Sequence, residues 1–179
     1  MGALADDGVG LFLAEHFEAA HQKVGTFRIV GGQKQGGNVA GYFCLTDGTV
    51  VHSVAGPVNA ETFLREARWA VDLRNLAVTE ARGSVEKYRA AVRRGHLERL
   101  EADTGHKLPP TTLPRITTLA PPVPPRSLLR TPAAARLGTQ DRVHLLLAYY
   151  PLPRLPDAYP VVFEQVLGEK VSTLPVATR

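Results

Sequence analysis

The single cysteine of the chain, Cys44, is the first residue to consider for redox chemistry. Dithiol exchange needs an attacking thiolate and a resolving partner, so one thiol excludes a CxxC pair, and it equally excludes a multi-cysteine zinc site. Cys44 lies between Phe43 and Leu45 in an apolar run. A reactive cysteine needs a cationic, partly exposed setting. We therefore interpret Cys44 as a small apolar residue of the core, with a single-thiol sensor or mixed-disulfide role as the alternative.

The histidines show no metal-ligand spacing. His16 and His21 are five residues apart, so on a helix they do not share a face as an i,i+4 pair would. His52 falls on a predicted hairpin, and no spacing brings these side chains to a carboxylate. We expect solvated or core-edge positions for these three and for the remaining histidines, which are His96, His106 and His144. We therefore assign no metal ligand, no cofactor site and no catalytic residue.

Two loop motifs remain. The glycines of residues 31–37 lack the GK[ST] ending of a phosphate loop and contain no GxGxxG, so they predict a flexible connection. Pro121, Pro124 and Arg126 fit the PxxPxR pattern that aromatic grooves recognise in polyproline II form. Such patterns arise easily in linkers, so we keep these three only as candidate partner-binding residues.

Composition and charge narrow the class of protein. The chain has 179 residues, 44% apolar and 21% charged, which favours one folded domain with an extension. No apolar run approaches the roughly 18–20 residues of a membrane span. Residues 1–7 lack the features of a signal peptide, and a lone cysteine fits a reducing compartment, so we expect a cytoplasmic protein.

The positive charge is concentrated but mixed with acids. No acidic residue occurs between Thr104 and Gly138, a strip that can bind acidic partners weakly. A predicted helix over residues 84–102 carries basic residues interleaved with glutamates, which favours a solvated face over a nucleic-acid surface. Its basic residues are Lys87, Arg89, Arg93, Arg94 and Arg99.

The elements that must position these residues follow from periodicity and capping. Apolar spacing predicts helices over residues 8–22, 60–76, 84–102, 140–150 and 157–167. Asn59 and Ser84 are the predicted caps of the second and third. Residues 27–30 read as a short strand. The run 42–54 predicts a hairpin, because Asp47-Gly48 suits a type I′ turn between two apolar segments.

These elements suggest four segments. We expect a half-domain over residues 1–78, a basic amphipathic helix over 79–105, a Pro-rich basic linker over 106–138 and a helical extension over 139–179. Eight of the 14 prolines lie between Leu108 and Pro132, which favours an extended linker or docking strap. The apolar residues of the extension need burial against the first segment or another chain.

The order helix, strand, loop, hairpin, helix in residues 3–77 resembles the second half of the thioredoxin-like fold. Residues 39–51, followed by Ala55-Gly56, resemble that family's apolar strand, D/N-G turn and second strand ending in glycine. Helix 60–76 takes the place of its last helix. The resemblance implies an α/β protein with a partial thioredoxin-like domain and a helical, Pro-rich C-terminal extension.

The departures from the family weigh against its activity. Val39 or Ala40 holds the place of the family's cis-proline, and the CxxC segment would lie upstream of Met1. We therefore expect a non-catalytic binding or scaffold protein without cofactor. We expect its partner to be an unknown protein or a second copy of this chain joined at the sheet edge. We expect it to bind neither a membrane nor nucleic acid. The alternative is an N-terminally truncated thiol–disulfide oxidoreductase.

Overall fold

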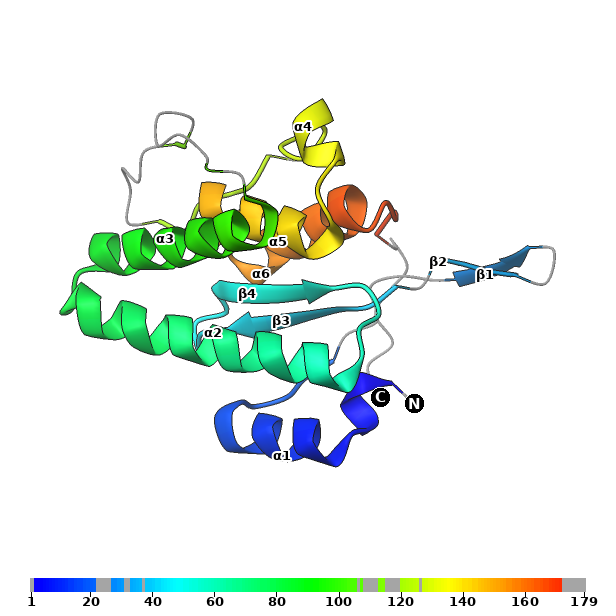
Figure 1. Cartoon of the computed structure of the whole chain (residues 1–179), viewed down its shortest axis with the longest axis horizontal. Coiled ribbons are helices and arrows are strands. Elements are labelled where there is room, and N and C mark those ends of the chain that lie inside the picture. Colours follow the sequence, from blue (N-terminus) through cyan, green and yellow to red (C-terminus); the bar gives the residue numbers. More distant parts are fainter. Residues whose placement is uncertain are drawn as a thin grey trace.

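The structure is a computed structural model that describes residues 2–21, 27–30, 33–36, 38–105, 107, 113–114, 120–125 and 127–171. Helices and antiparallel strands are combined, with helix predominating, so the expected mixed α/β class is confirmed. In Figure 1 the sheet of β3 (Ala40–Cys44) and β4 (Val50–Ala55) lies between α2 (Ala60–Ala81) and a layer containing α5 (Thr139–Tyr149) and α6 (Leu155–Val161). None of the helices in these ranges has the length and apolar character needed to cross a bilayer.

The central hairpin forms as predicted. Ala40 lies opposite Ala55 and Tyr42 opposite Ser53, with a bulge between Phe43 and Cys44. Every residue of β4 is buried, because α2 covers one face and α5 the other. A strand buried on both faces has no solvent side, so polar side chains on it must find partners within the protein.

The turn of this hairpin differs from the prediction. Gly48 has a φ of 79° and donates to the Leu45 carbonyl at 2.9 Å, but Asp47 does not have the positive φ that a type I′ turn requires. The Asp47 carboxylate instead accepts from the amide of Thr49 at 3.0 Å and from its hydroxyl at 2.7 Å. These side-chain bonds stabilise a turn with one left-handed residue, and the type I′ assignment was wrong.

The first helix is shorter than predicted. Helix α1 (Asp7–His16) begins with the Asp6 side chain accepting from the Val9 amide at 3.1 Å, and it ends at Phe17, whose φ is −141°. The Phe17 ring contacts Phe43 with centroids 5.3 Å apart. The helix therefore ends before residue 22, its predicted end, because Phe17 packs on the β3–β4 hairpin instead of continuing the helix.

Residues 27–30 and 33–36 pair as a separate two-stranded sheet. The predicted strand 27–30 is confirmed as β1 (Phe27–Val30), which pairs antiparallel with β2 (Gln33–Gly36). Treating residues 31–37 as only a flexible loop was therefore wrong, because residues 33–36 extend and pair with β1. This hairpin projects from the body in Figure 1 and does not join the β3–β4 sheet.

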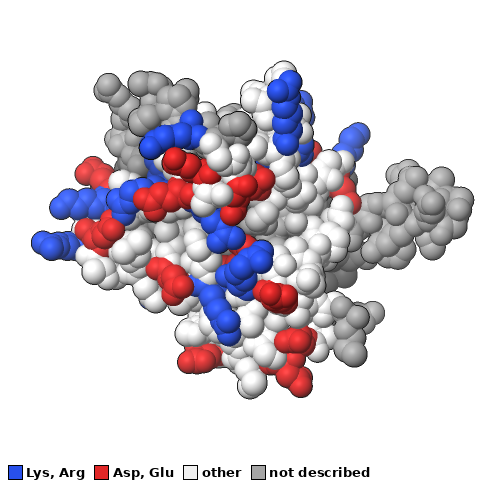
Figure 2. Space-filling view, viewed as in Figure 1, with Lys and Arg blue, Asp and Glu red and all other residues white. Residues whose placement is uncertain are grey.

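The two long helices form a helical hairpin. Helix α2 begins where the Asn59 side chain accepts from the Thr62 amide at 2.8 Å, and α3 (Val85–Thr104) begins at Ser84, so both predicted caps are confirmed. Helix α2 runs five residues beyond its predicted end. Figure 2 shows blue and red side chains interspersed over the charged surface rather than a uniform basic patch.

Not all of the basic residues of α3 are solvated. Arg89 is buried, contrary to the expected solvated face. Arg93 donates to the carbonyls of Ala148 at 2.9 Å and Tyr149 at 3.2 Å, where α5 ends. The side chain of Arg93 therefore caps the C-terminus of α5 and joins two helices that are far apart in sequence.

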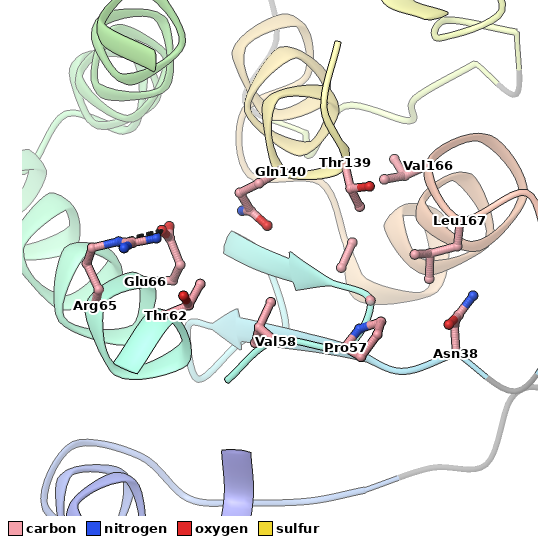
Figure 3. Close-up of a pocket in the computed structure, with 12 residues that line it drawn as sticks. Asn38, Pro57, Val58, Thr62, Arg65, Glu66, Thr139, Gln140, Val166 and Leu167 are labelled. Atoms are coloured by element: carbon pink, nitrogen blue, oxygen red, sulfur yellow. Dashed lines mark hydrogen bonds and ion pairs between the residues drawn. The ribbon is translucent and has the colours of Figure 1, made fainter. Parts of the chain in front are cut away.

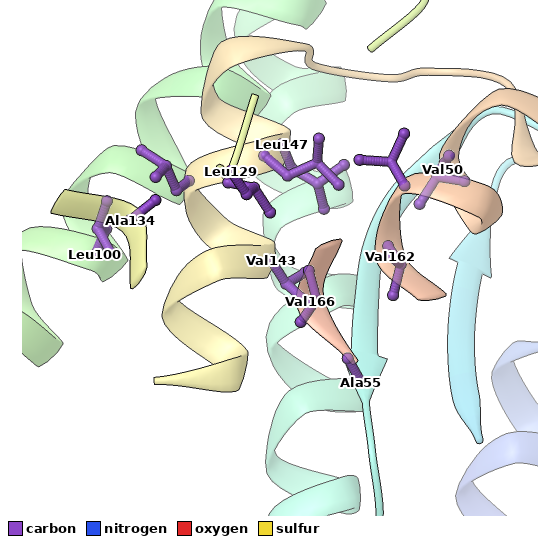
Figure 4. Packing of buried hydrophobic residues seen from close by; sticks show 13 residues of the cluster. Val50, Ala55, Leu100, Leu129, Ala134, Val143, Leu147, Val162 and Val166 are labelled. Carbon is purple, nitrogen blue, oxygen red and sulfur yellow. The ribbon is translucent and has the colours of Figure 1, made fainter. Parts of the chain in front are cut away.

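The C-terminal part packs back on the hairpin. Helix α6 continues as a π-helical turn over Val162–Val166, and α4 (Pro132–Ala135) precedes α5. One hydrophobic cluster draws residues from all four sequence segments (Figure 4). Its members include Val50, Leu100, Leu129, Val143 and Leu146. Apolar residues in the described part of the extension, such as Val143, Leu146 and Val162, are thus buried within this chain.

Two of the three candidate partner-binding residues lie in the described part of the chain. Pro124 is buried and Pro121 is partly buried, while Arg126 lies outside the described residues. Gln165 fixes the following segment, since its side chain accepts from the Leu129 amide at 2.6 Å and donates to the Pro125 carbonyl at 3.3 Å. The described part of the Pro-rich stretch behaves as a strap held on the fold.

Candidate metal centre

Three histidines from different elements meet in the core. His52 comes from β4, His96 from α3 and His144 from α5, and each is fully buried. One nitrogen of each ring lies within 4.8 Å of the corresponding nitrogens of the other two. The expectation of solvated or core-edge positions was therefore wrong for all three.

The surrounding elements place these rings with little freedom. His52 lies in the strand that is buried on both faces. His96 follows Gly95, where α3 passes so close to α2 that a Cβ at residue 95 would overlap Leu73. His144 lies in a wholly buried run of α5, between Val143 and Leu145. Tight packing on every side fixes the positions of the three side chains.

His52 is anchored through one ring nitrogen. Its Nε2 lies 3.2 Å from Oε2 of the buried Glu66 carboxylate, which can only accept, so the proton of a neutral His52 is on Nε2. Nδ1 then carries a lone pair. Among the described residues this buried Nδ1 has no hydrogen-bond partner.

His96 is anchored in the same way. Its Nε2 donates to the Val51 carbonyl at 2.9 Å, so Nδ1 carries the lone pair. His144 Nδ1, 2.9 Å from His96 Nδ1, must then be the donor of that pair. This leaves the lone pair of His144 on Nε2, which is buried and without a partner in the described part of the chain.

Trp69 closes the cluster from α2. Its ring lies edge-on to all three imidazoles, with centroids 4.7 Å from His52, 5.1 Å from His96 and 5.0 Å from His144. The rings of His52 and His144 stack with centroids 5.1 Å apart. Because it is the sole tryptophan of the chain, Trp69 is a built-in optical reporter of any change in the cluster.

Burial keeps the histidines neutral. Desolvation lowers the pKa of His52, although the hydrogen bond and charge of Glu66 act in the opposite direction. Burial first, and then the repulsion that a protonated His52 would exert, lowers the pKa of His96 to about 3. The pKa of His144 is also lowered, first by burial and then by neighbouring His96. All three rings therefore offer lone pairs at neutral pH, as metal ligation requires.

Glu66 remains ionised despite its burial. Desolvation acts to raise its pKa, but the hydrogen bond from His52 and the charges of Arg99 and Arg65 outweigh it, so the pKa is lowered. Both guanidinium groups lie 3.3 Å from Oε1 of Glu66. The carboxylate is thus neutralised by arginines on one oxygen and holds His52 with the other.

A solvent-facing hollow of about 380 Å³ is lined by Arg65, Thr62, Thr139, Glu66 and Gln140, among others (Figure 3). Glu66 Oε2 lies 3.2 Å and Gln140 Nε2 lies 3.4 Å from Nε2 of His52. The Gln140 amide donates to the Ser53 carbonyl at 2.8 Å. The hollow therefore approaches His52 from the Nε2 side, opposite the unpartnered Nδ1.

The other candidate residues lie elsewhere. Cys44 ends β3 half-buried, and burial, with the charge of Asp47, raises its pKa to about 11. His16 and His21 are exposed on and after α1, as expected, and His106 lies outside the described residues. Cys44, His16 and His21 do not belong to the cluster.

The sequence did contain a signal for the buried histidines. His96 stands four residues after Val92 and four before Leu100, on the buried stripe of α3. His52 interrupts a strand of apolar residues, and His144 an apolar run. A histidine in an apolar pattern is buried, but nothing in the spacing shows that three of them meet.

Comparison with known proteins adds no assignment. A scan of protein-family models and searches of curated proteins and of solved structures found no match to this chain. The candidate centre therefore depends on its own geometry.

Proposed function

We propose that this protein binds a transition-metal ion through His52, His96 and His144. The observation that carries the proposal is the pattern of anchored and unpartnered nitrogens. His52 and His96 each bind an acceptor through Nε2, which leaves Nδ1 of each ring as the donor atom for a metal. Nδ1 of His144 lies 2.9 Å from Nδ1 of His96 and is the third candidate donor atom. Metal-ligating histidines characteristically donate their second nitrogen to a carboxylate or carbonyl in this way.

The present separations require a small adjustment. Metal–nitrogen bonds of about 2.0–2.1 Å place ligand nitrogens roughly 3.3 Å apart. The nitrogens here lie within 4.8 Å of one another, so the rings must move closer to bind an ion. The proton of His144 must also move from Nδ1 to Nε2, because Nδ1 is the nitrogen beside His96. The bound ion would satisfy the buried Nδ1 lone pair of His52, which otherwise costs free energy.

The ion would act mainly as a structural link. It would join β4, α3 and α5, and ligands brought together only by folding make metal binding and folding one process. Glu66 and Gln140 line the hollow, and none of the three histidines does. This supports a binding role rather than catalysis at the ion.

The test uses full-length protein freed of metal with a chelator. Addition of one equivalent of Zn²⁺, Co²⁺ or Cu⁺ is expected to change Trp69 fluorescence and raise the melting temperature, with one ion bound per chain. Ligand at 100 times its Kd stabilises a protein by about 2.7 kcal/mol. His52→Gln should lose both responses and His21→Ala should keep them. Absence of any binding below millimolar concentration contradicts the proposal.

Cys44 supports the non-catalytic binding or scaffold role that we also propose. A thiol whose pKa is about 11 is almost entirely protonated at neutral pH, and the thiolate is the nucleophile in exchange. The expected rate of insulin disulfide reduction is that of the Cys44→Ala variant. A rate well above it would favour the truncated thioredoxin-like oxidoreductase instead.

Self-association through the sheet edge is also a proposal. β3 pairs with β4 on one side, and no strand of the described ranges pairs with its other edge. A second copy could add a strand there. Size-exclusion chromatography with light scattering tests this, and a clean monomer at micromolar concentration would contradict it.

A further inference from the structure

We propose that the ion held by the three histidines is monovalent copper, bound by three imidazole nitrogens without a fourth ligand. This inference depends on the metal-binding function proposed above and names the ion that fits the site. Three observations support it: the number of donors, the exclusion of water and the local charge.

The cluster offers three donors. In the described part of the chain no further histidine, cysteine or carboxylate joins it. The nearest carboxylate, Glu66, lies on the Nε2 side of His52, and the imidazole ring separates it from the Nδ1 lone pair. Structural zinc sites almost always have four ligands, and divalent copper prefers four in a tetragonal arrangement. A d¹⁰ monovalent copper ion is stable with three.

A water molecule is poorly placed to supply a fourth ligand. All three histidines are fully buried, and the Trp69 ring packs against each of them. Glu66 and Gln140 line the hollow, and none of the three histidines does. Water that reached the ion from solvent would therefore have to pass this packed shell.

The charges around the cluster favour a monovalent ion over a divalent one. The single carboxylate beside the cluster is already neutralised by Arg65 and Arg99. The cost of burying an ion grows with the square of its charge, so an uncompensated divalent ion is disfavoured much more than a monovalent one. Neutral imidazoles provide donor atoms but no compensating negative charge.

The experiment titrates the full-length, metal-free protein without oxygen. Cu⁺, added as its acetonitrile complex, competes with a chromophoric Cu⁺ chelator, and Zn²⁺ competes with a zinc chelator. We expect Cu⁺ to bind on the order of a thousand-fold more tightly than Zn²⁺. X-ray absorption of the Cu⁺-loaded protein should show three nitrogen neighbours at roughly 2.0 Å.

Two variants test the argument separately. His52→Gln should weaken Cu⁺ binding at least about tenfold, whereas His21→Ala should not change it. Glu66→Gln removes the negative charge and leaves both arginines, so it should increase the preference for Cu⁺ over Zn²⁺. If His52→Gln fails to fold, the absorption measurement on the unaltered protein still decides.

The outcomes distinguish the two proposals. Tighter binding of Zn²⁺, or a fourth ligand on copper, overturns the present inference and leaves the metal-binding function intact. Failure of every ion to bind overturns both.

Discussion

His144 shows how one buried side chain can serve binding at the expense of stability. Its Nε2 lone pair has no partner among the described residues, and an unpaired buried polar atom costs about 1–3 kcal/mol. Stability alone would place an apolar residue there, as at neighbouring Val143 and Leu145. Residues that violate packing rules concentrate at functional sites.

His144→Leu is therefore expected to separate stability from binding. Leucine has a similar volume and removes one unpaired nitrogen, but it leaves His96 Nδ1 without its donor. The free energy of unfolding of the metal-free protein should change by less than about 1 kcal/mol. The metal-induced rise in melting temperature should disappear. A large decrease in the free energy of unfolding of the metal-free protein would show that the His96–His144 hydrogen bond itself stabilises the fold.

The buried histidines also predict acid sensitivity. Their folded-state pKa values are lowered, to about 3 for His96, whereas an unfolded histidine titrates near pH 6.5. Below about pH 6.5 the unfolded chain therefore binds protons that the native protein does not, and the native state loses stability as the pH falls toward 3. Above about pH 6.5 this effect vanishes.

Urea unfolding of the metal-free protein between pH 7.5 and 4.5 measures this loss. Each histidine contributes a slope of up to about 1.4 kcal/mol per pH unit. The slope should be shallower in His144→Leu, which removes one of the buried rings. A flat profile would mean that the rings are accessible to protons in the native state.

At the scale of elements, the contact between α2 and α3 controls the position of His96. Gly95→Ala would place a Cβ against the buried Leu73 and should destabilise the protein by about 1–3 kcal/mol, despite the better helix propensity of alanine. Thermal unfolding measures this. The matched control is Gly10→Ala in α1, where no atom lies within 4 Å, and there stability should rise by up to about 1 kcal/mol. Equal changes in stability for Gly95→Ala and Gly10→Ala would contradict the close approach of α3 to α2 at Gly95.

The sequence predicted elements best where local chemistry decides the outcome. The caps at Asn59 and Ser84 and the β3–β4 hairpin were predicted because side-chain hydrogen bonds and turn residues lie within a few positions. The early end of α1 was missed, because Phe17 leaves the helix to contact Phe43. Strand β2 was missed because its glycine- and glutamine-rich sequence has no apolar alternation.

At the scale of the whole molecule, the C-terminal part and the hairpin share a core. Leu146 is fully buried in the same cluster as Val50 of β4. Leu146→Ala should therefore cost about 2–5 kcal/mol and lower a single unfolding transition. Far-UV circular dichroism and the fluorescence of Trp69, on α2, should shift together.

The control for this prediction is Leu76→Ala, at a position that is 50% exposed on α2, where the change should stay within about 0.5 kcal/mol. If Leu146→Ala left the Trp69 transition unchanged, the residues after 138 would behave as an independent unit.

The candidate site could not be predicted at this scale. His96 and His144 contact each other across 48 positions, and the Val51–His96 hydrogen bond spans 45. Local patterns show that each histidine faces a core, but only the packing of α3 and α5 on β4 shows that they face the same one. The amphipathic periodicity used for helices contains no information on such pairing.

The spacing of the three histidines has a consequence for biosynthesis. A ribosome makes His52 and His96 first, and α5, with His144, follows 48 positions after the second of them. A nascent chain that ends before α5 has two of the three donors and no closed core, so it cannot retain an ion in the way the finished protein would. Loading of the complete site must therefore follow synthesis of α5.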